Sequence, residues 1–458
     1  MKLIICGAGQ VGLSIANYLE QYGNHIVVID QSVELVQQIS DRHDIQAIQG
    51  FASDPEVLAK AGAANADMFI AVTQSDEINM VACEVAHALF NIPTKIARIR
   101  NQAYLKPEWI HLFEKENICI DSIISPEIEL ARSIRRSLSV LGAFNIIHMG
   151  DNRVKVIGIK CTVDTPIVNT PISHITSLFP EVNIRIIAIM RGNHCFIPHE
   201  KEVIISGDDI YFAVENEHVP IAMKAFGHYS QEKRRVLILG GGIVGLTLAQ
   251  EIEVHVEDIN VRIIEKFKDR AEFISRSLET SQVLCGDALD SEVLSEAGVE
   301  FMETVVAVTH DDNVNTLASL LAKRCGAGRA LSLINNPGSI PLVTSLGVDA
   351  VINPRAITVS TILNKVRRGH ILGVHTLRED FGELIEAEVH ENSSLSGLKV
   401  SEVDSPNEIK VAAIIRKDDV IIPTASTIFH LDDRVVVMAV NSAIKDIERL
   451  FSARLDYF

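Results

Sequence analysis

Continuous, largely apolar runs alternate with amphipathic stretches in two long segments of the chain. The first segment holds such runs at 2–6, 25–29, 67–72 and 95–99, and the second at 236–239, 261–264 and 305–308. Runs of this length are typical of parallel strands that are buried on both faces, and the stretches between them predict helices that cover the sheet. The pattern therefore predicts an α/β fold with two doubly wound parallel sheets.

A glycine-rich loop follows the first strand of each segment, and a helical run follows each loop. Both loops have the spacing G-x-G-x-x-G. The first glycine allows a sharp turn, the second lets the backbone approach a pyrophosphate, and the third lets the helix pack on the strand. The amides of the helix N-terminus then face the phosphates. The spacing predicts two Rossmann-like domains with the phosphate-binding residues Gly7, Ala8, Gly9, Gln10, Val11 and Gly12 in the first and Gly240, Gly241, Gly242, Ile243, Val244 and Gly245 in the second.

An acidic residue ends the second strand of each segment, Asp30 in the first and Glu265 in the second. A carboxylate at this position can accept both hydroxyls of an adenosine ribose, and its charge repels a 2′-phosphate. The ligand is therefore expected to be NAD-like or ATP-like rather than NADP-like. Further candidate side chains follow the later strands, at the sheet edge where ligands bind. They are Phe51, Thr73, Gln74 and Arg98 in the first segment and Asp287, Thr309 and His310 in the second.

The two segments are copies of each other. Residues 71–80 and 307–316 share five identities in ten positions at a constant offset of 236. One difference concerns charge, because the first copy has Arg98-Ile-Arg100-Asn101 where the second reads Ser332-Leu-Ile-Asn335. Guanidinium groups there could pair with phosphates, or they could be solvated surface charges. In the first case the two pockets differ in affinity or ligand.

A predicted connector helix and a strand-rich region follow each copy. The connectors begin at Ser125-Pro126 and Asn353-Pro354, since Ser or Asn before Pro favours a helix start. Each strand-rich region carries a pair of aspartates, Asp208-Asp209 or Asp432-Asp433, which could bind a cation or form the turn before a strand. The expected domains are Rossmann-like at 1–124 and 232–352, and small α/β at 142–227 and 369–453.

The composition narrows the function classes. A formal net charge of −18 over 458 residues argues against a general nucleic-acid binder and against polybasic adhesion to lipid. We expect no membrane span, because no apolar run approaches about 18 residues, and no signal peptide. The seven cysteines form no C-x-x-C pair, which suits reduced thiols in a cytoplasm rather than a metal site.

The tandem order of nucleotide domain, connector helix and small α/β domain resembles the regulator-of-potassium-conductance (RCK) family over the whole chain. The resemblance rests on the two glycine loops, on Asp30 and Glu265, and on the segments that begin at Ala71, Arg98 and Ala307. It implies a non-enzymatic regulatory protein that binds NAD, NADH, ATP or ADP without turning it over. It further implies a ring of identical chains, either a dimer or a tetramer. Such a ring would lie in the cytoplasm at the inner face of the cell membrane and would gate a potassium-translocating integral membrane protein.

Two other classes of function stay open. An NAD-dependent oxidoreductase needs a proton donor and a substrate clamp beside the cofactor. The string Tyr229-x-x-x-Lys233 suggests such a donor, but it lies in a polar linker and is interpreted as coincidence. P-loop hydrolysis is not expected, since no G-x-x-x-x-G-K-[ST] occurs. A soluble nucleotide sensor without a channel partner would need only the nucleotide sites.

Overall fold

The computed structural model describes residues 1–21, 23–42, 45–114, 116–178, 183–192, 194–228, 234–256, 258–366, 371–378, 381–391 and 393–451. The chain forms two compact units. One unit comprises residues 1–133 and 234–366, and the other comprises residues 134–233 and 367–458, so the chain enters each unit twice. The string from Tyr229 to Lys233 lies outside the described residues.

The first parallel sheet is built by the first copy. Its strand order is β3-β2-β1-β4-β5-β6, and every neighbouring pair is parallel. Alternate residues of the central strand pack into two different buried clusters, Ile4 on one face and Ile5 on the other, as the continuous apolar run predicts. The strands are β1 (Lys2–Cys6), β2 (His25–Asp30), β3 (Gln46–Gln49), β4 (Met68–Ala71), β5 (Thr94–Arg98) and β6 (Ser122–Ile124), and the helices are α1 (Gln10–Gln21), α2 (Val33–Arg42), α3 (Pro55–Lys60) and α4 (Asp76–Phe90).

The second copy repeats this topology. Its order, β14-β13-β12-β15-β16-β17, is the order of the first sheet strand for strand, and all its pairs are parallel. The two tandem Rossmann-like sheets expected from the sequence are thus confirmed. The strands are β12 (Arg234–Leu239), β13 (Ile259–Glu265), β14 (Gln282–Cys285), β15 (Thr304–Ala307), β16 (Arg329–Leu333) and β17 (Ala350–Ile352), and the helices are α8 (Ile243–His255), α9 (Lys268–Ser277), α10 (Ser291–Glu296), α11 (Asp312–Arg324) and α12 (Ile340–Ser345).

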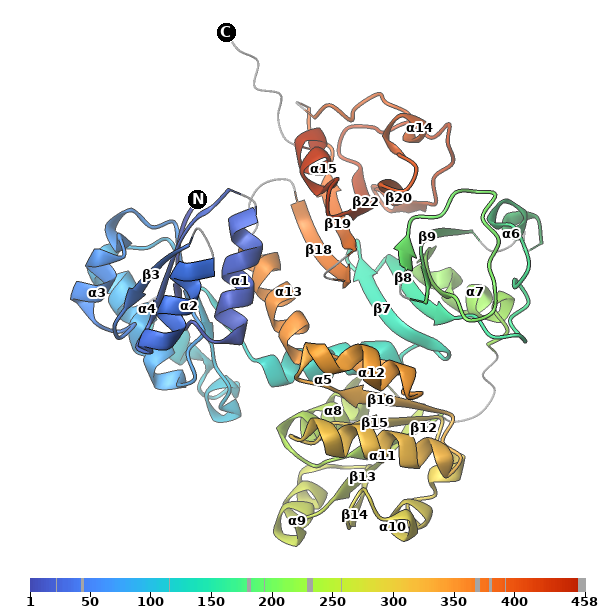
Figure 1. Cartoon of the computed structure of the whole chain (residues 1–458), viewed down its shortest axis with the longest axis horizontal. Helices are drawn as coiled ribbons and strands as arrows, with labels where there is room; N and C mark the ends of the chain where they lie inside the picture. The colour runs from blue at the N-terminus through green and yellow to red at the C-terminus, as the bar shows by residue number, and fades with distance from the viewer. Residues whose placement is uncertain are drawn as a thin grey trace. The chain divides into compact units, whose positions relative to one another are not determined.

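The connector helices cross between the copies. Helix α13 (Pro354–Val366) follows the second copy but lies against α1 of the first (Figure 1). Its Ile362 is fully buried in one cluster with Ile15 and Leu19 of α1. Helix α5 (Pro126–Leu138) follows the first copy, and its Arg132 pairs with Glu251 of α8, with 3.2 Å between Nε and Oε1. Each connector therefore contacts the first helix of the other copy.

The second unit contains two antiparallel sheets of equivalent topology, β10-β9-β11-β8-β7 and β21-β20-β22-β19-β18. The first comprises β7 (Ala143–Met149), β8 (Val154–Lys160), β9 (Ile184–Arg191), β10 (His194–Phe196) and β11 (Asp209–Glu215), with α6 (Ile172–Leu178) and α7 (Val219–Ala225). The second comprises β18 (Ile371–Arg378), β19 (Gly382–Glu388), β20 (Ile409–Arg416), β21 (Asp419–Ile421) and β22 (Arg434–Val440), with α14 (Val400–Val403) and α15 (Ile444–Phe451). The domain boundaries stay a prediction, and those at 232, 369 and 453 lie outside the described residues.

The aspartate pairs of the small domains hold arginines rather than a free cation site. The carboxylate of Asp208 accepts two hydrogen bonds from the guanidinium of Arg191, at 2.8 and 2.9 Å. Asp433 and Arg416 repeat this arrangement at the same two distances. Both carboxylates are fully buried, and the hydrogen bonds that Arg416 donates to Asp433 raise the pKa of Arg416. Within the described ranges, no group of three His, Cys, Asp or Glu side chains could hold a metal ion.

None of the helices in the described part of the chain is long and apolar enough to cross a bilayer.

Candidate functional site

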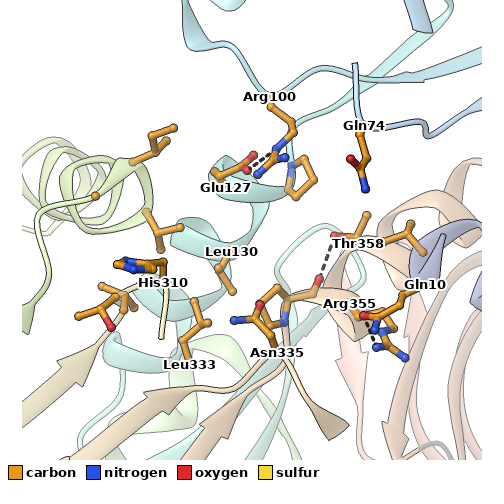
Figure 2. Close-up of a pocket in the computed structure, with 18 of the residues that line it drawn as sticks. Gln10, Gln74, Arg100, Glu127, Leu130, His310, Leu333, Asn335, Arg355 and Thr358 are labelled. Carbon is orange, nitrogen blue, oxygen red and sulfur yellow. Dashed lines mark hydrogen bonds and ion pairs between the residues drawn. The ribbon is translucent and has the colours of Figure 1, made fainter. Parts of the chain in front are cut away.

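The two glycine loops open onto one cavity of the first unit. The cavity has a volume of about 1310 Å³ and is lined by residues of both copies, including the carboxyl ends of the sheets and the starts of both connectors (Figure 2). Pockets for single small ligands usually measure about 300–1,000 Å³. The cavity is therefore large enough for more than one such ligand.

The fold itself requires the first and third glycines of each loop. Gly7 has a φ of +108°, and a Cβ on it would lie 3.0 Å from the carbonyl oxygen of Val72. A Cβ on Gly12 would lie only 1.8 Å from the carbonyl oxygen of Gly7. The second copy repeats both constraints, with a φ of +106° at Gly240 and 2.0 Å between a Gly245 Cβ and the Gly240 oxygen. A side chain at these positions would collide with backbone.

The second glycine of each loop has no such structural reason. A Cβ on Gly9 or Gly242 would meet no atom within 4 Å, and neither residue has a left-handed backbone. Both residues line the cavity. Glycine at these two positions therefore keeps the space in front of the loop open, which is the property that a close-lying phosphate group needs.

Two helices begin at this space. The first backbone bond of α1 runs from the N–H of Leu13 to the oxygen of Gly9, at 2.9 Å, and that of α8 from Leu246 to Gly242, at 3.0 Å. The N–H groups of the three residues that begin each helix consequently have no acceptor inside it. Together with the helix dipole, they favour an anion at this position.

The two acidic residues are tied to the loops in the same way. Asp30 accepts the N–H of Ala8 at 2.6 Å and that of Ser32 at 2.8 Å. Glu265 accepts the N–H of Gly241 at 2.8 Å and that of Phe267 at 2.9 Å. Since a carboxylate has about four acceptor positions, each can still accept a ribose hydroxyl.

Two side chains crowd the extra glycine of the second loop. A Cβ on Gly241 would lie 2.9 Å from Oε2 of Glu265 and 2.2 Å from Cδ1 of Ile274. The shorter Asp30 leaves room for the methyl group of Ala8, which is buried.

Thr73 and Thr309 are held by asparagines. Each hydroxyl donates to a side-chain oxygen at 2.7 Å, that of Asn79 in the first copy and that of Asn315 in the second. Both asparagines are fully buried, and each also bonds the carbonyl oxygen of the neighbouring strand's last residue at 2.9 Å. The sequence prediction did not include these asparagines among the site residues, although both lie in the ten-residue segment shared by the copies.

The alignment of the arginine segment was wrong by one residue. Asp76 accepts the backbone N–H of Arg100 and Asn101, and Asp312 accepts those of Asn335 and Asn336. Arg100 therefore corresponds to Asn335, and Arg98 to Leu333 rather than Ser332. The underlying point is unchanged, because neither equivalent in the second copy is a cation.

The first-copy arginines differ in their surroundings. Arg100 pairs with Glu127 of α5, with 3.1 Å between Nε and Oε1 (Figure 2). Burial and the charge of Arg100 lower the pKa of Arg98. The Nε of Arg98 is buried and has no hydrogen-bond partner among the described residues. Since Arg98 lines the cavity, an anionic ligand would relieve this unpaired donor.

Three further cations line the cavity and escaped the sequence prediction. Lys266 pairs with Asp287, with 2.9 Å between Nζ and Oδ2. Arg270 donates from Nε to the oxygen of Gly241 at 2.8 Å. Arg355, from the second connector, donates to the side chain of Gln10. The second copy and its connector thus bring cations to the cavity, but at positions other than those of Arg98 and Arg100 in the first copy.

The cavity gathers most of the predicted site residues. Those that do not line it are Ala8, Gly12, Gly241 and Gly245. The others line it: Gly7, Gly9, Gln10, Val11, Asp30, Phe51, Thr73, Gln74, Arg98, Gly240, Gly242, Ile243, Val244, Glu265, Asp287, Thr309 and His310. Their roles toward a ligand stay a prediction.

Comparison with protein families gives matches over most of the chain. The TrkA-N domain matches residues 3–126 and 236–354, and the TrkA-C domain matches residues 384–452. The two TrkA-N matches coincide with the two parallel sheets described above.

Curated relatives match end to end. The chain is 42% identical over 458 residues to the Trk system potassium uptake protein TrkA of Azorhizobium caulinodans, with 100% of both chains covered. It is 35% identical over 455 residues to the protein of the same name from Vibrio alginolyticus, with 98% of each covered.

Solved structures agree in fold. The GsuK RCK domain is 17% identical with a TM-score of 0.60, covering 98% of this chain and 94% of its own. The GsuK channel bound to NAD is 17% identical with a TM-score of 0.59, covering 98% of this chain and 78% of its own. With two TrkA-N matches, RCK-like architecture and 42% identity over its full length to a TrkA protein, the chain belongs to the TrkA family of Trk system potassium uptake proteins.

Proposed function

We propose that this chain is the regulatory subunit of a potassium-uptake system, which binds NAD(H) or an adenine nucleotide at its two Rossmann-like sites and gates a membrane partner. The observation that carries the nucleotide part is the second glycine of each loop. Gly9 and Gly242 have open space where a side chain would be, beside the free amides of a helix N-terminus. A pyrophosphate is the group that this combination accommodates.

The ligand is NAD, NADH, ATP or ADP in this proposal. Asp30 and Glu265 would accept the ribose hydroxyls, and the glycine loops would hold the phosphates. Support comes from the GsuK channel, a structural neighbour that has been solved with NAD bound. In this proposal the residues of the chain bind and orient the ligand, and no catalytic step is included.

The partner in this proposal is a potassium-translocating integral membrane protein of the TrkH or TrkG type, at the cytoplasmic face of the cell membrane. The names of the curated relatives, which are potassium uptake proteins of the Trk system, support this assignment. Identical chains would form a ring that is a dimer or a tetramer.

Gating would use the shared cavity. A ligand that contacts both copies favours one packing of the copies over another, and the ring carries this change to the partner. The shift is limited by the ligand's differential affinity for the two packings, typically about 1–3 kcal/mol per site.

Calorimetric titration of the purified chain with NADH, NAD, ATP and ADP tests the nucleotide part. We expect binding without chemical change of the ligand, checked by chromatography after the titration.

Potassium uptake by cells that lack their own TrkA, with and without this chain, tests the transport part. Turnover with an added carbonyl substrate would establish an oxidoreductase instead, and binding without any effect on uptake would leave a soluble nucleotide sensor.

A further inference from the structure

The two connector helices present opposite charges at equivalent positions. Each connector begins with a proline, Pro126 in α5 and Pro354 in α13, and the next residue is Glu127 in the first and Arg355 in the second. Both of these charged residues line the cavity. The cavity therefore receives a negative charge from one connector and a positive charge from the other.

Arg355 reaches the glycine loop of the other copy. Its Nη2 donates to Oε1 of Gln10 at 2.5 Å (Figure 2). Gln10 is the first residue of α1, so the guanidinium contacts the side chain of the residue with which this helix begins. The bond to Gln10 uses one of the five N–H donors of a guanidinium group. The remaining donors suit an anion with several oxygen atoms, as in bidentate arginine–phosphate pairs.

Glu127 takes the equivalent position in α5. Its carboxylate pairs with Arg100 of its own copy, at 3.1 Å. A carboxylate offers no donor to a phosphate, and its charge opposes one. At this position, therefore, α13 offers a phosphate a cation and α5 does not.

Helix α13 packs against α1, the helix that begins at the first glycine loop. It packs on α1 through Ile362, which is fully buried, and Val359, which is partly buried. After α13 ends at Val366, the chain runs into the second small domain. A ligand that contacts Arg355 would consequently stabilise α13 in its place against α1.

We infer that Arg355 binds the phosphates of the nucleotide at the first glycine loop and couples the occupancy of that site to helix α13. The inference rests on the proposed nucleotide binding. It assigns to the first site a preference for nucleoside diphosphates and triphosphates over the phosphate-free nucleoside, through a cation at a position where the other connector carries Glu127.

Calorimetry on the full chain tests the binding role, with ADP and adenosine as probes and with Arg355→Gln, Arg355→Lys and Arg276→Gln as variants. Arg276 is the matched control, because its side chain is 82% exposed on α9. For Arg355→Gln we expect ADP to bind the first site about tenfold to a hundredfold more weakly, since a charged hydrogen bond is lost. Adenosine affinity should stay unchanged, Arg355→Lys should recover part of the loss, and Arg276→Gln should match the unchanged chain.

The outcomes separate this inference from the proposed function. Absence of ADP binding to the unchanged chain overturns both. Unchanged ADP affinity in Arg355→Gln, or an equal loss of ADP and adenosine affinity, overturns only the role of Arg355.

Hydrogen exchange tests the coupling. ADP should slow amide exchange in α13 of the unchanged chain and of Arg276→Gln, and should have no such effect in Arg355→Gln at ADP concentrations that saturate the variant. Equal protection of α13 in Arg355→Gln would show that the site is not coupled through this residue.

Discussion

Replacing Gly9 by alanine should separate ligand binding from stability. The new Cβ would meet no atom within 4 Å, and the backbone is not left-handed, so alanine fits the folded chain. Alanine reduces the entropy of the unfolded chain, which stabilises by about 0.4–1 kcal/mol. It is also a poorer residue than glycine just before a helix, which costs about 0.5–1 kcal/mol. These two effects offset each other, and the free energy of unfolding should change by less than about 1 kcal/mol.

Binding should respond much more strongly. The methyl group would occupy the space that we assign to the phosphates, and the loss of charged hydrogen bonds to the amides corresponds to about 1.5–3 kcal/mol. Affinity for NADH at the first site should therefore fall by at least about tenfold. Gly12→Ala provides the contrast, because its Cβ would lie 1.8 Å from the oxygen of Gly7. This variant should lose about 3 kcal/mol or more of stability.

Urea denaturation and NADH calorimetry on the same preparations make the comparison. Gly242→Ala, with the same open surroundings, should lose only the second binding event. Unaltered NADH affinity in both variants would refute the reasoning about the second glycine. A loss of more than about 2 kcal/mol of stability in Gly9→Ala would show that the fold requires this glycine after all.

Three further changes have defined outcomes. Asp433→Ala should destabilise the second unit by about 2–3 kcal/mol in denaturant unfolding, because it leaves Arg416 partly buried without its partner; a change below about 0.5 kcal/mol would mean that the pair is not structural. Burial, with Arg136 and His148 nearby, lowers the pKa of His375 to about 4. The unfolded chain therefore binds a proton more readily than the folded chain, and up to about 3 kcal/mol of stability should be lost as pH falls from about 6.5 toward 4. The slope of unfolding free energy against pH should flatten in His375→Phe, and an unchanged slope would assign the pH dependence to other groups. Gly241→Ala should destabilise the second copy because of the contacts with Glu265 and Ile274, and Glu265→Asp in the same chain should relieve part of the loss in thermal unfolding; no relief would leave Ile274 as the main obstacle.

The local pattern of the sequence was enough to predict the sheets. Buried strands such as β1 and β12 are continuous apolar runs, and the glycine spacing depends on neighbours in the chain, so both signals are local. The acidic residues Asp30 and Glu265 could be placed for the same reason. Asn79 and Asn315 could also have been found, since both belong to the segment that the copies share.

The parts that escaped prediction depend on contacts between distant segments. Arg355 lies 345 residues after Gln10, and no local pattern indicates that a connector of one copy reaches the loop of the other. The alignment error at Ser332 has a similar origin, because the correspondence is fixed by the backbone bonds to Asp312 rather than by side-chain similarity. The extra Gly241 follows from crowding by the side chains of Ile274 and Glu265, which only the folded chain brings to the loop.

The crossed connector helices have a consequence for how such a chain could have arisen. In a chain with a single copy, this same crossed packing would need the connector of a second molecule, so two molecules would exchange their helices to bury Ile15, Leu19 and Ile362 together. The present chain is, in this sense, an intertwined dimer joined into one polypeptide. Within one polypeptide the two copies can differ in sequence. They do so at Glu127 and Arg355, a position where a symmetric dimer of identical chains must carry the same residue twice.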